Sequence, residues 1–381
     1  MDFGWTDKQQ AAYASSVSFA QQQLNDDLRQ RDADASFDLD LWRKCSEFGV
    51  LGWCVPTQYG GAGLDVLSSV RMLEGIGYGC RDNALTLGLN GQIWTVQEPL
   101  LQFGSEQLKQ RYLPRLCCGE LLAADAISEP DSGSDAFSLK TRAEKVSGGY
   151  LLNGQKSYIG LAPVAGMSLV FANTNPDAKQ WGVSAFIVES GFDGYTASPP
   201  RLKMGLRTTP LGDILLENCF VPEENRLGTE GAGFSIFNHS ANWERSFIFT
   251  SHIGSMARQL DECVRYTRQR KQFGKAIAEF QSVSNRLADM KLRLETSQLL
   301  LYKLAWLKQR GDQATLEAAM AKLHLGEAFA ANSLDAMRIH GARGYLSEYE
   351  VERDLRDALG GVIYGGTSDI QRNIVARLLG Q

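Results

Sequence analysis

Two long segments in the last third of this 381-residue chain repeat apolar side chains at helical spacing, and this pattern constrains the fold most. The side chains recur every three, four or seven residues, which places them on one face of an α-helix. The first set is Val283, Leu287, Met290, Leu294, Leu301 and Leu304, and the second is Leu316, Met320, Leu323, Ala330, Leu334 and Met337. Long helices must cover such faces, so the pattern predicts a helical bundle with both stripes in its core.

Helical patterns also dominate the beginning of the chain. They predict helices over residues 11–31, 39–48, 67–77 and 84–103, with the glycine-rich segment Tyr59–Leu64 as a loop. Past residue 121 the chain changes to short β-branched and aromatic runs, which predict strands over residues 150–158, 168–172, 183–188 and 213–220. Inside the first of these runs, the Asn153-Gly154 pair favours a hairpin turn.

This order of elements predicts a mainly α protein with a central β domain. We expect an N-terminal α-helical domain over residues 1–120, a small β-barrel-like middle domain over 121–230 and a C-terminal four-helix bundle over 231–381. The chain has no strand-linked GxGxxG turn, so a Rossmann-type nucleotide site is not indicated.

Composition excludes several classes of function. The seven cysteines are an odd number without CxxC spacing, and only four histidines accompany them, so neither a disulfide scaffold nor a metal site is indicated. Lysine and arginine are scattered over a chain of net charge -5, which argues against nucleic-acid binding. We find no secretory pattern and no apolar run of membrane-spanning length, and therefore expect a cytoplasmic protein without a membrane partner.

Four motifs carry the chemical information. The first three have a structural explanation when taken alone: a polar turn, a buried strand tyrosine and a solvated charge run at a helix end. The motifs are Ser128-Glu129-Pro130-Asp131-Ser132-Gly133-Ser134-Asp135, Asn153-Gly154-Gln155-Lys156-Ser157-Tyr158-Ile159-Gly160, Arg268-Gln269-Arg270-Lys271-Gln272-Phe273-Gly274 and Tyr364-Gly365-Gly366-Thr367-Ser368-Asp369-Ile370-Gln371-Arg372. Their order and spacing closely resemble those of the flavin-dependent acyl-CoA dehydrogenases.

The resemblance implies the acyl-CoA dehydrogenase fold and an FAD cofactor. Ser128 would hold the pyrimidine edge of the flavin and Tyr158 would stack on it, while Gly160 stands where the family carries a threonine. The cofactor-binding residues implied in this way are Ile127, Ser128, Gly133, Tyr158, Gly160, Arg270, Phe273, Gln281, Arg338, Gly341, Ala342, Thr367 and Asp369.

The resemblance also implies an oligomer. In the family, the residues that match Arg270 and Phe273 reach the FAD of a neighbouring subunit, where the arginine pairs with the pyrophosphate. Arg338 replaces a glutamine that is usual in the family, and its guanidinium could serve the same pyrophosphate. We therefore expect a homotetramer with shared cofactor sites.

Two departures from the family pattern compensate for each other. Most members carry the catalytic base at the position of Gly365, which here has no side chain. In the isovaleryl-CoA and long-chain branches the base comes from an earlier helix, at a position that falls on Glu244. A mid-helix glutamate is more often ion-paired, here with Arg245 or a helix neighbour, but the coincidence with Gly365 favours Glu244 as base. The Gly365 backbone amide would still serve the oxyanion hole.

Because Gly365 has no side chain at the usual position of the base, the resemblance implies a substrate that is bulky near the thioester. Within the family the chain is most similar to flavoproteins of secondary metabolism that oxidise L-prolyl thioesters on carrier proteins to pyrroline thioesters. Such a substrate reaches the site on the phosphopantetheine of an acyl carrier protein, and Arg201, Lys203 and Arg207 could form a basic rim for this acidic partner. The expected substrate-binding residues are Ser134, Trp243, Arg245 and Tyr364.

Other functions remain open at this point. A short branched-chain acyl-CoA is the alternative substrate for the same reaction. A lyase on the same fold would need no α-proton base, and a non-catalytic flavoprotein would need neither base nor substrate. The sequence leaves open whether oxygen or an electron-transfer flavoprotein accepts the electrons, and whether one or two oxidations occur.

Overall fold

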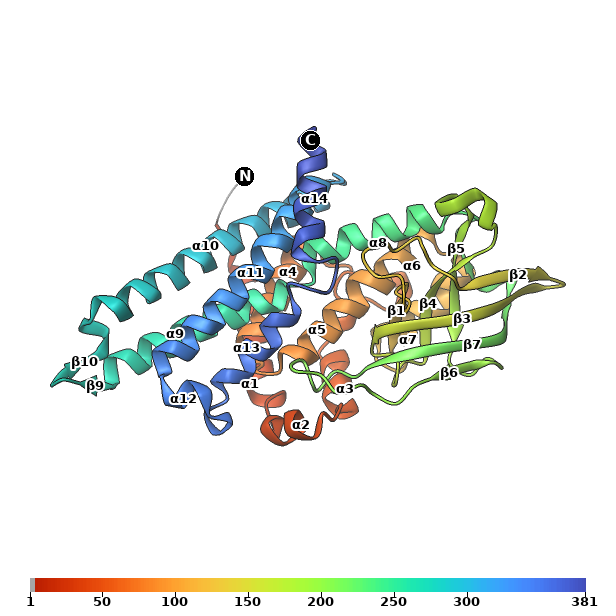
Figure 1. The fold of residues 1–381 in the computed structure, drawn as a ribbon. Coiled ribbons are helices and arrows are strands. Elements are labelled where there is room, and N and C mark those ends of the chain that lie inside the picture. The colour runs from red at the N-terminus through yellow and green to blue at the C-terminus, as the bar shows by residue number, and fades with distance from the viewer. Residues whose placement is uncertain (1–3) are drawn as a thin grey trace.

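Helices fill the N-terminal part of the computed structural model, which describes residues 4–381 (Figure 1). They are α1 (Asp7–Gln23), α2 (Leu28–Asp34), α3 (Leu39–Glu47), α4 (Val66–Gly79), α5 (Asn83–Gly91), α6 (Glu98–Phe103) and α7 (Glu106–Cys117). A π-helical segment, Gln92–Gln97, joins α5 to α6. Five of these helices have an N-cap residue whose side chain accepts a hydrogen bond from a backbone amide of the first turn. These residues are Thr6, Asp38, Asp65, Asp82 and Ser105.

The single helix expected over residues 11–31 is wrong, because the chain divides there into α1 and α2. Asn25 lies between them, and its side chain bonds to the end of α4. Its amide donates to the Gly79 carbonyl at 3.0 Å, and its oxygen accepts the Arg81 amide at 2.7 Å. Asp27 then takes a left-handed backbone conformation, with φ 51°. A tertiary hydrogen bond has overridden the helical pattern.

The middle of the chain forms an eight-stranded sheet. The strands are β1 (Ala123–Ala126), β2 (Arg142–Val146), β3 (Gly149–Gly160), β4 (Met167–Asn173), β5 (Val183–Glu189), β6 (Tyr195–Ala197), β7 (Leu211–Pro222) and β8 (Arg226–Leu227). Their order is β6-β7-β3-β2-β4-β5-β8, and β1 pairs in parallel with β4. The four expected strands are therefore confirmed as β3, β4, β5 and β7.

The hairpin turn expected at Asn153-Gly154 is wrong, since β3 runs through both residues. The pairing register with β7 shifts between Leu152 and Gly154, which marks a β-bulge. A Cβ on Gly154 would lie 2.4 Å from the Thr141 hydroxyl oxygen. The glycine therefore permits a close approach of two segments inside the sheet, and no turn forms.

The last third of the chain is helical again. Its helices are α8 (Gly233–Phe247), α9 (Thr250–Gln269), α10 (Gln281–Gln309), α11 (Thr315–His340), α12 (Ala342–Tyr345), α13 (Val351–Gly360) and α14 (Ser368–Leu378). A small hairpin, β9 (Lys271–Gln272) with β10 (Lys275–Ala276), joins α9 to α10. Figure 1 shows this hairpin at one end of the molecule and the large sheet at the other. The domain boundaries at residues 120 and 230 stay a prediction.

The two apolar stripes have different outcomes. On α10 four of the six predicted core residues, Met290, Leu294, Leu301 and Leu304, are buried, whereas Val283 and Leu287 are only partly buried. On α11 the prediction is wrong, because none of its six stripe residues is buried and Met320 is 41% exposed. This helix packs against α8, α9, α10, α13 and α14, and its small side chains allow close approach. Its buried residues include Ala318, Ala319, Ala321, Lys322, Leu325, Gly326 and Ala328.

The close approach of α4 and α9 depends on a glycine, which gives a stability prediction. A methyl group at Gly77 of α4 would lie 1.7 Å from the Ser251 carbonyl oxygen of α9. We expect Gly77→Ala to lower the free energy of unfolding by about 3 kcal/mol or more. Gly91→Ala is the control, because nothing lies within 4 Å of its added carbon and alanine favours a helix. Equal denaturation midpoints for the two variants would contradict the packing described here.

Candidate active site

The Glu244 carboxyl lies beside the backbone of Gly365. Glu244 belongs to α8, and Gly365 lies in the turn between α13 and α14. A Cβ built on Gly365 would be 3.1 Å from Glu244 Oε1 and 3.3 Å from Glu244 Cδ. Gly365 also has φ +63°, a conformation that L side chains rarely adopt. A carboxyl from one helix therefore stands where a side chain of the turn would otherwise project.

Glu244 has no fixed partner. Within residues 4–381 its carboxyl makes no hydrogen bond or ion pair, so the alternative of an ion pair with Arg245 or a helix neighbour is wrong. Burial raises the pKa of Glu244, while the positive charges of Arg245 and Lys322 act in the opposite direction. The residue nevertheless remains partly accessible. An unpaired carboxyl with a raised pKa is suited to proton transfer.

Two buried side chains clamp the turn that contains Gly365. Lys322 Nζ donates to the carbonyl oxygens of Gly361 at 3.0 Å and Gly366 at 2.6 Å. Gln371 Nε2 donates to the carbonyl oxygens of Gly365 at 3.1 Å and Gly366 at 3.0 Å. The Gly365 N–H makes no hydrogen bond within the described part of the chain. The clamp thus occupies the carbonyls of the turn and leaves this N–H available to a ligand.

Sequence reasoning missed Lys322. The side chain is 1% exposed, and burial lowers its pKa to about 8 although the charge of Glu244 raises it. A signal was present, since the lysine stands in a run of small residues that includes Ala321 and Gly326. Lysine is seldom fully buried, so one inside a close-packed helix face indicates a specific partner.

Stacked aromatic rings hold two of the expected substrate residues next to Glu244. Trp243 stacks on Trp94 of the π-helical segment, with ring centroids 5.7 Å apart and planes at 10°. Tyr364 stacks on Phe249, with centroids 5.7 Å apart and planes at 26°. Both rings are fixed by neighbours on other elements, so they form rigid apolar walls.

The other two expected substrate residues lie in different surroundings. Arg245 is partly buried, and its Nε has no hydrogen-bond partner among the described residues. Burial lowers the pKa of Arg245, while the nearby Glu244 raises it. Ser134 is exposed in the loop between β1 and β2. Arg245 therefore belongs to the surroundings of the carboxyl, and Ser134 to an outer surface.

Five expected cofactor residues lie in β3 or in the loop that follows β1: Ile127, Ser128, Gly133, Tyr158 and Gly160. We call them the sheet cluster. The Ser157 amide donates to the Ser128 carbonyl at 2.9 Å, which joins the first motif to β3. A buried ion pair between Lys156 Nζ and Glu129 Oε1, at 2.8 Å, fixes the same junction. The structure therefore brings together two motifs that are separate in the sequence.

The sheet cluster has room for a flat ring system. The Tyr158 side chain is 56% exposed. Near it on β3, a Cβ on Gly160 would have no atom within 4 Å, and the same holds for Gly133. An exposed aromatic face beside an open glycine fits the stacking of a flavin, so these residues fit FAD.

The second group of expected cofactor residues lies at the far end of the bundle. We call it the bundle-end cluster: Arg270, Phe273, Gln281, Arg338, Gly341 and Ala342. Tyr266 stacks on His340 with centroids 4.3 Å apart, which joins the ends of α9 and α11 there. Figure 1 shows that this end and the sheet lie at opposite extremes of one chain. A single chain therefore does not bring the two clusters together.

Two further expected cofactor residues begin α14. The Thr367 hydroxyl oxygen accepts the Ile370 amide at 3.2 Å and so caps the helix. Asp369 is exposed and lies 3.4 Å from the Arg372 guanidinium. Both side chains are near Gly365 in sequence, and Thr367 helps to fix the end of the clamped turn.

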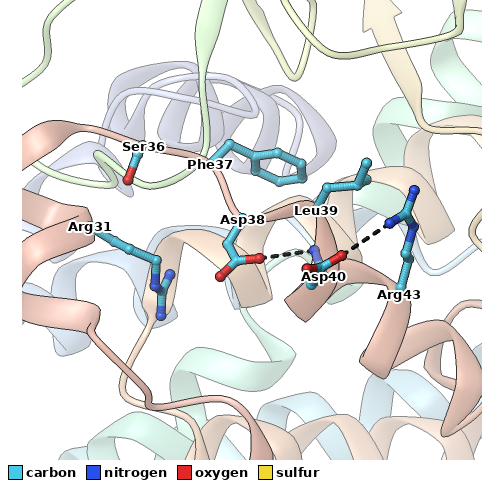
Figure 2. Close-up of a pocket in the computed structure, with 7 residues that line it drawn as sticks. All are labelled: Arg31, Ser36, Phe37, Asp38, Leu39, Asp40 and Arg43. Carbon is cyan, nitrogen blue, oxygen red and sulfur yellow. Dashed lines mark hydrogen bonds and ion pairs between the residues drawn. The ribbon is translucent and has the colours of Figure 1, made fainter.

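A separate surface pocket of about 320 Å³ lies on α2 and α3 (Figure 2). It is lined by Arg31, Ser36, Phe37, Asp38, Leu39, Asp40 and Arg43. Its polar groups are already engaged, since Asp38 caps α3 and Arg43 pairs with Asp40 at 3.0 Å. None of the expected site residues contributes to it.

Residues 4–381 contain neither a metal-binding cluster nor a helix that could cross a membrane. No group of three or more histidine, cysteine, aspartate or glutamate side chains could hold a metal ion in this part of the chain. Among the same residues, every helix is too short or too polar to cross a membrane.

The fold and the three-part sequence match place the chain in one family. Models of the N-terminal, middle and C-terminal domains of acyl-CoA dehydrogenases match residues 6–120, 124–219 and 231–380. The chain belongs to the acyl-CoA dehydrogenase family. The expected fold is confirmed, as is the expected class of enzyme, an FAD-dependent acyl-thioester dehydrogenase.

Within this family, the chain is similar to several proteins that act on prolyl groups. The chain is 40% identical over its whole length to an L-prolyl-[peptidyl-carrier protein] dehydrogenase from Pseudomonas fluorescens, of which it covers 100%. It is 39% identical to the protein of the same description from a Serratia species, with 100% of this chain and 98% of that protein covered. Among solved structures, the prolyl acyl carrier protein oxidase AnaB superposes with a TM-score of 0.98 at 46% identity, covering 99% of this chain and all of AnaB. PigA, solved with FAD and proline, gives a TM-score of 0.97 at 38% identity, with 100% and 99% covered.

The position of Lys322 gives a prediction on pH dependence. Lys322→Met removes a positive charge that lowers the pKa of Glu244, so that pKa should rise. Because a protonated Glu244 could not accept a proton, the acid limb of the pH profile for flavin reduction should move to higher pH. Lys303→Met is the control, since Lys303 is half-exposed and faces Glu317 at 3.4 Å. An unchanged acid limb in Lys322→Met would contradict the electrostatic role of Lys322.

Proposed function

We propose that this protein oxidises an L-prolyl thioester carried by an acyl carrier protein, with Glu244 as base, and gives a pyrroline-carboxyl thioester. The observation that carries the proposal is the position of the unpaired Glu244 carboxyl, whose Oε1 lies 3.1 Å from the point that a Cβ of residue 365 would occupy. The carboxyl can approach a substrate carbon that lies over the turn, because no side chain at residue 365 stands in the way.

The residues of this chain divide the reaction between them. Glu244 removes the proton from the carbon next to the thioester carbonyl, and its burial favours proton uptake. The free Gly365 N–H donates to the carbonyl oxygen, where negative charge develops. Ser128 and Tyr158 would hold the flavin of FAD, which would supply the acceptor for the hydride that leaves the neighbouring carbon as the carbon–carbon double bond forms. Trp243 and Tyr364 exclude water from the reacting carbon.

The choice of prolyl as substrate rests on the relatives. The full-length relatives at 40% and 39% identity are described as prolyl carrier-protein dehydrogenases, and AnaB as a prolyl carrier-protein oxidase. The isovaleryl-CoA dehydrogenase of Solanum tuberosum is 36% identical to this chain over 98% of its length. A branched acyl-CoA is therefore the comparison substrate.

We place the carrier protein on the sheet side of the molecule, near Ser134. Of the expected basic rim, Arg201 is exposed, and its guanidinium pairs with Asp213 at 2.5 Å and lies 5.3 Å from the Tyr158 ring. Lys203 is partly buried against the Thr209 carbonyl, and Arg207 donates to the Ala33 carbonyl at 3.0 Å. Arg201 is therefore the member of this rim best placed to meet an acidic carrier protein.

We further propose that the protein works as a homo-oligomer, a tetramer by family resemblance, in the cytoplasm. The bundle-end cluster of one chain cannot reach its own sheet cluster, so a second chain is needed to complete each FAD site. The Phe273 side chain is 93% exposed, as expected of a residue that a partner covers. All seven cysteines are free, which fits a reducing compartment.

Replacing the base should stop the first chemical step. We expect Glu244→Gln to bind FAD but to slow anaerobic flavin reduction by prolyl-loaded carrier protein at least about 100-fold. Glu327→Gln, an exposed side chain paired with Arg372 on the bundle surface, should behave as the unmodified protein. Mass spectrometry of prolyl-loaded carrier protein and of isovaleryl-CoA then identifies the substrate by the loss of two hydrogens. Full turnover by Glu244→Gln would favour a lyase and refute the proposal.

If two chains share each FAD site, a substitution in the bundle-end cluster should weaken FAD binding. We expect Arg270→Ala to weaken FAD binding about 10- to 100-fold while the oligomer stays intact, because a charged hydrogen bond to the pyrophosphate is lost. Arg268→Ala is the matched control from the same exposed helix end. FAD content after gel filtration, with mass measured by light scattering, separates cofactor loss from dissociation. Full retention of FAD by Arg270→Ala would remove the support for a shared site.

A further inference from the structure

A second carboxyl, that of the partly exposed Asp125, is close enough to Glu244 for the charge of Glu244 to act on it, and it makes no hydrogen bond or ion pair within residues 4–381. Side chains alternate between the two faces of a strand, so Asp125 in β1 shares a face with Ala123 and Ile127. Ala123 is buried in the apolar cluster between the sheet and helices α6 to α8, and Ile127 packs against that cluster. Asp125 Oδ1 is buried, and no hydrogen bond to it occurs within residues 4–381. A carboxyl has therefore been placed on the apolar side of the strand that leads into the sheet cluster.

The protein supplies no cation for this carboxyl. The charged groups close enough to influence Asp125 are Glu244, which is also acidic, and Lys156. Lys156 is already engaged, since its Nζ donates to Glu129 Oε1 at 2.8 Å and to the Ile127 carbonyl at 3.1 Å. Burial first, and then the charge of Glu244, raise the pKa of Asp125 well above its ordinary range. The negative charge of Glu244 therefore acts on an Asp125 carboxyl that has no hydrogen-bonded cation among residues 4–381.

The proposed substrate carries such a charge. The ring nitrogen of a prolyl group is bonded directly to the carbon from which Glu244 would take the proton. A secondary amine is protonated at neutral pH and has two N–H bonds to donate. A branched acyl group of similar size offers only carbon at this place, and would leave the buried carboxyl without a partner.

We propose that Asp125 binds the protonated ring nitrogen of the prolyl thioester and so selects this substrate over carbocyclic and branched acyl groups. The inference rests on the proposed function and extends it to a specificity-determining residue. Asp125 accepts a hydrogen bond from the ring N–H and takes no part in bond breaking. The pairing holds the ring so that the neighbouring carbon–hydrogen bond faces Glu244. The positive nitrogen next to that carbon also makes its proton easier to remove.

The test compares two acyl groups of nearly equal shape. Carrier protein is loaded with L-proline or with cyclopentanecarboxylate, which has carbon in place of the ring nitrogen, and anaerobic flavin reduction is followed by stopped flow. Asp125→Leu should reduce flavin with the prolyl substrate about 100-fold more slowly, and with the cyclopentane substrate at least as fast as the unmodified protein. Asp125→Asn, which keeps the shape but not the charge, should fall between them. Asp193→Asn is the control, an exposed carboxyl of the same domain.

Binding and folding are measured alongside the rates. FAD content and melting temperature of each variant report on folding, and the change in flavin absorbance on titration with L-proline reports on nitrogen binding. A weaker response to L-proline in both Asp125 variants supports the inference. An equal loss of rate with both acyl groups would make Asp125 a structural residue and overturn it, as would unchanged rates with the prolyl substrate. If the unmodified protein oxidises only the cyclopentane or isovaleryl substrate, the proposed function itself fails, and this inference with it.

Discussion

The site depends on one steric fact: the carboxyl of Glu244 and a side chain at residue 365 cannot share the same volume. A Cβ on Gly365 would already lie 3.1 Å from Glu244 Oε1, and the backbone there has positive φ. Glycine therefore serves two purposes, since it admits the carboxyl of α8 and allows the turn to adopt its conformation. The clamp formed by Lys322 and Gln371 then holds the turn against that carboxyl.

The electrostatics follow from this geometry. Burial raises the pKa of both Glu244 and Asp125, and the positive charges of Arg245 and Lys322 act in the opposite direction on Glu244. On the sheet, the buried pair of Lys156 and Glu129 joins the two motifs of the sheet cluster and uses up the available cation. Lys156 is thus engaged by Glu129 and Lys322 by backbone carbonyls, and a substrate cation has a place to fill beside Asp125.

Local pattern predicted some elements of the fold and failed on others for identifiable reasons. The stripe on α10 was right because one face of that helix meets the core, whereas α11 has neighbours on most sides and buries its small residues and Lys322 instead. Asn153-Gly154 has the composition of a turn, but the neighbouring Thr141 leaves room only for a glycine in a bulged strand. In both cases contacts remote in sequence decided the outcome.

The sequence by itself determined the family, the FAD chemistry that goes with it and the pairing of an empty position 365 with a glutamate at 244, because motif order and spacing survive without coordinates. Only the tertiary structure decided that Glu244 is unpaired, that the Gly365 amide is free, that Lys322 clamps the turn and that a buried oxygen of Asp125 has no partner within residues 4–381. These properties depend on the distances between α8, α11, β1 and the α13–α14 turn. Segments so far apart in the chain meet only when the bundle and the sheet pack together.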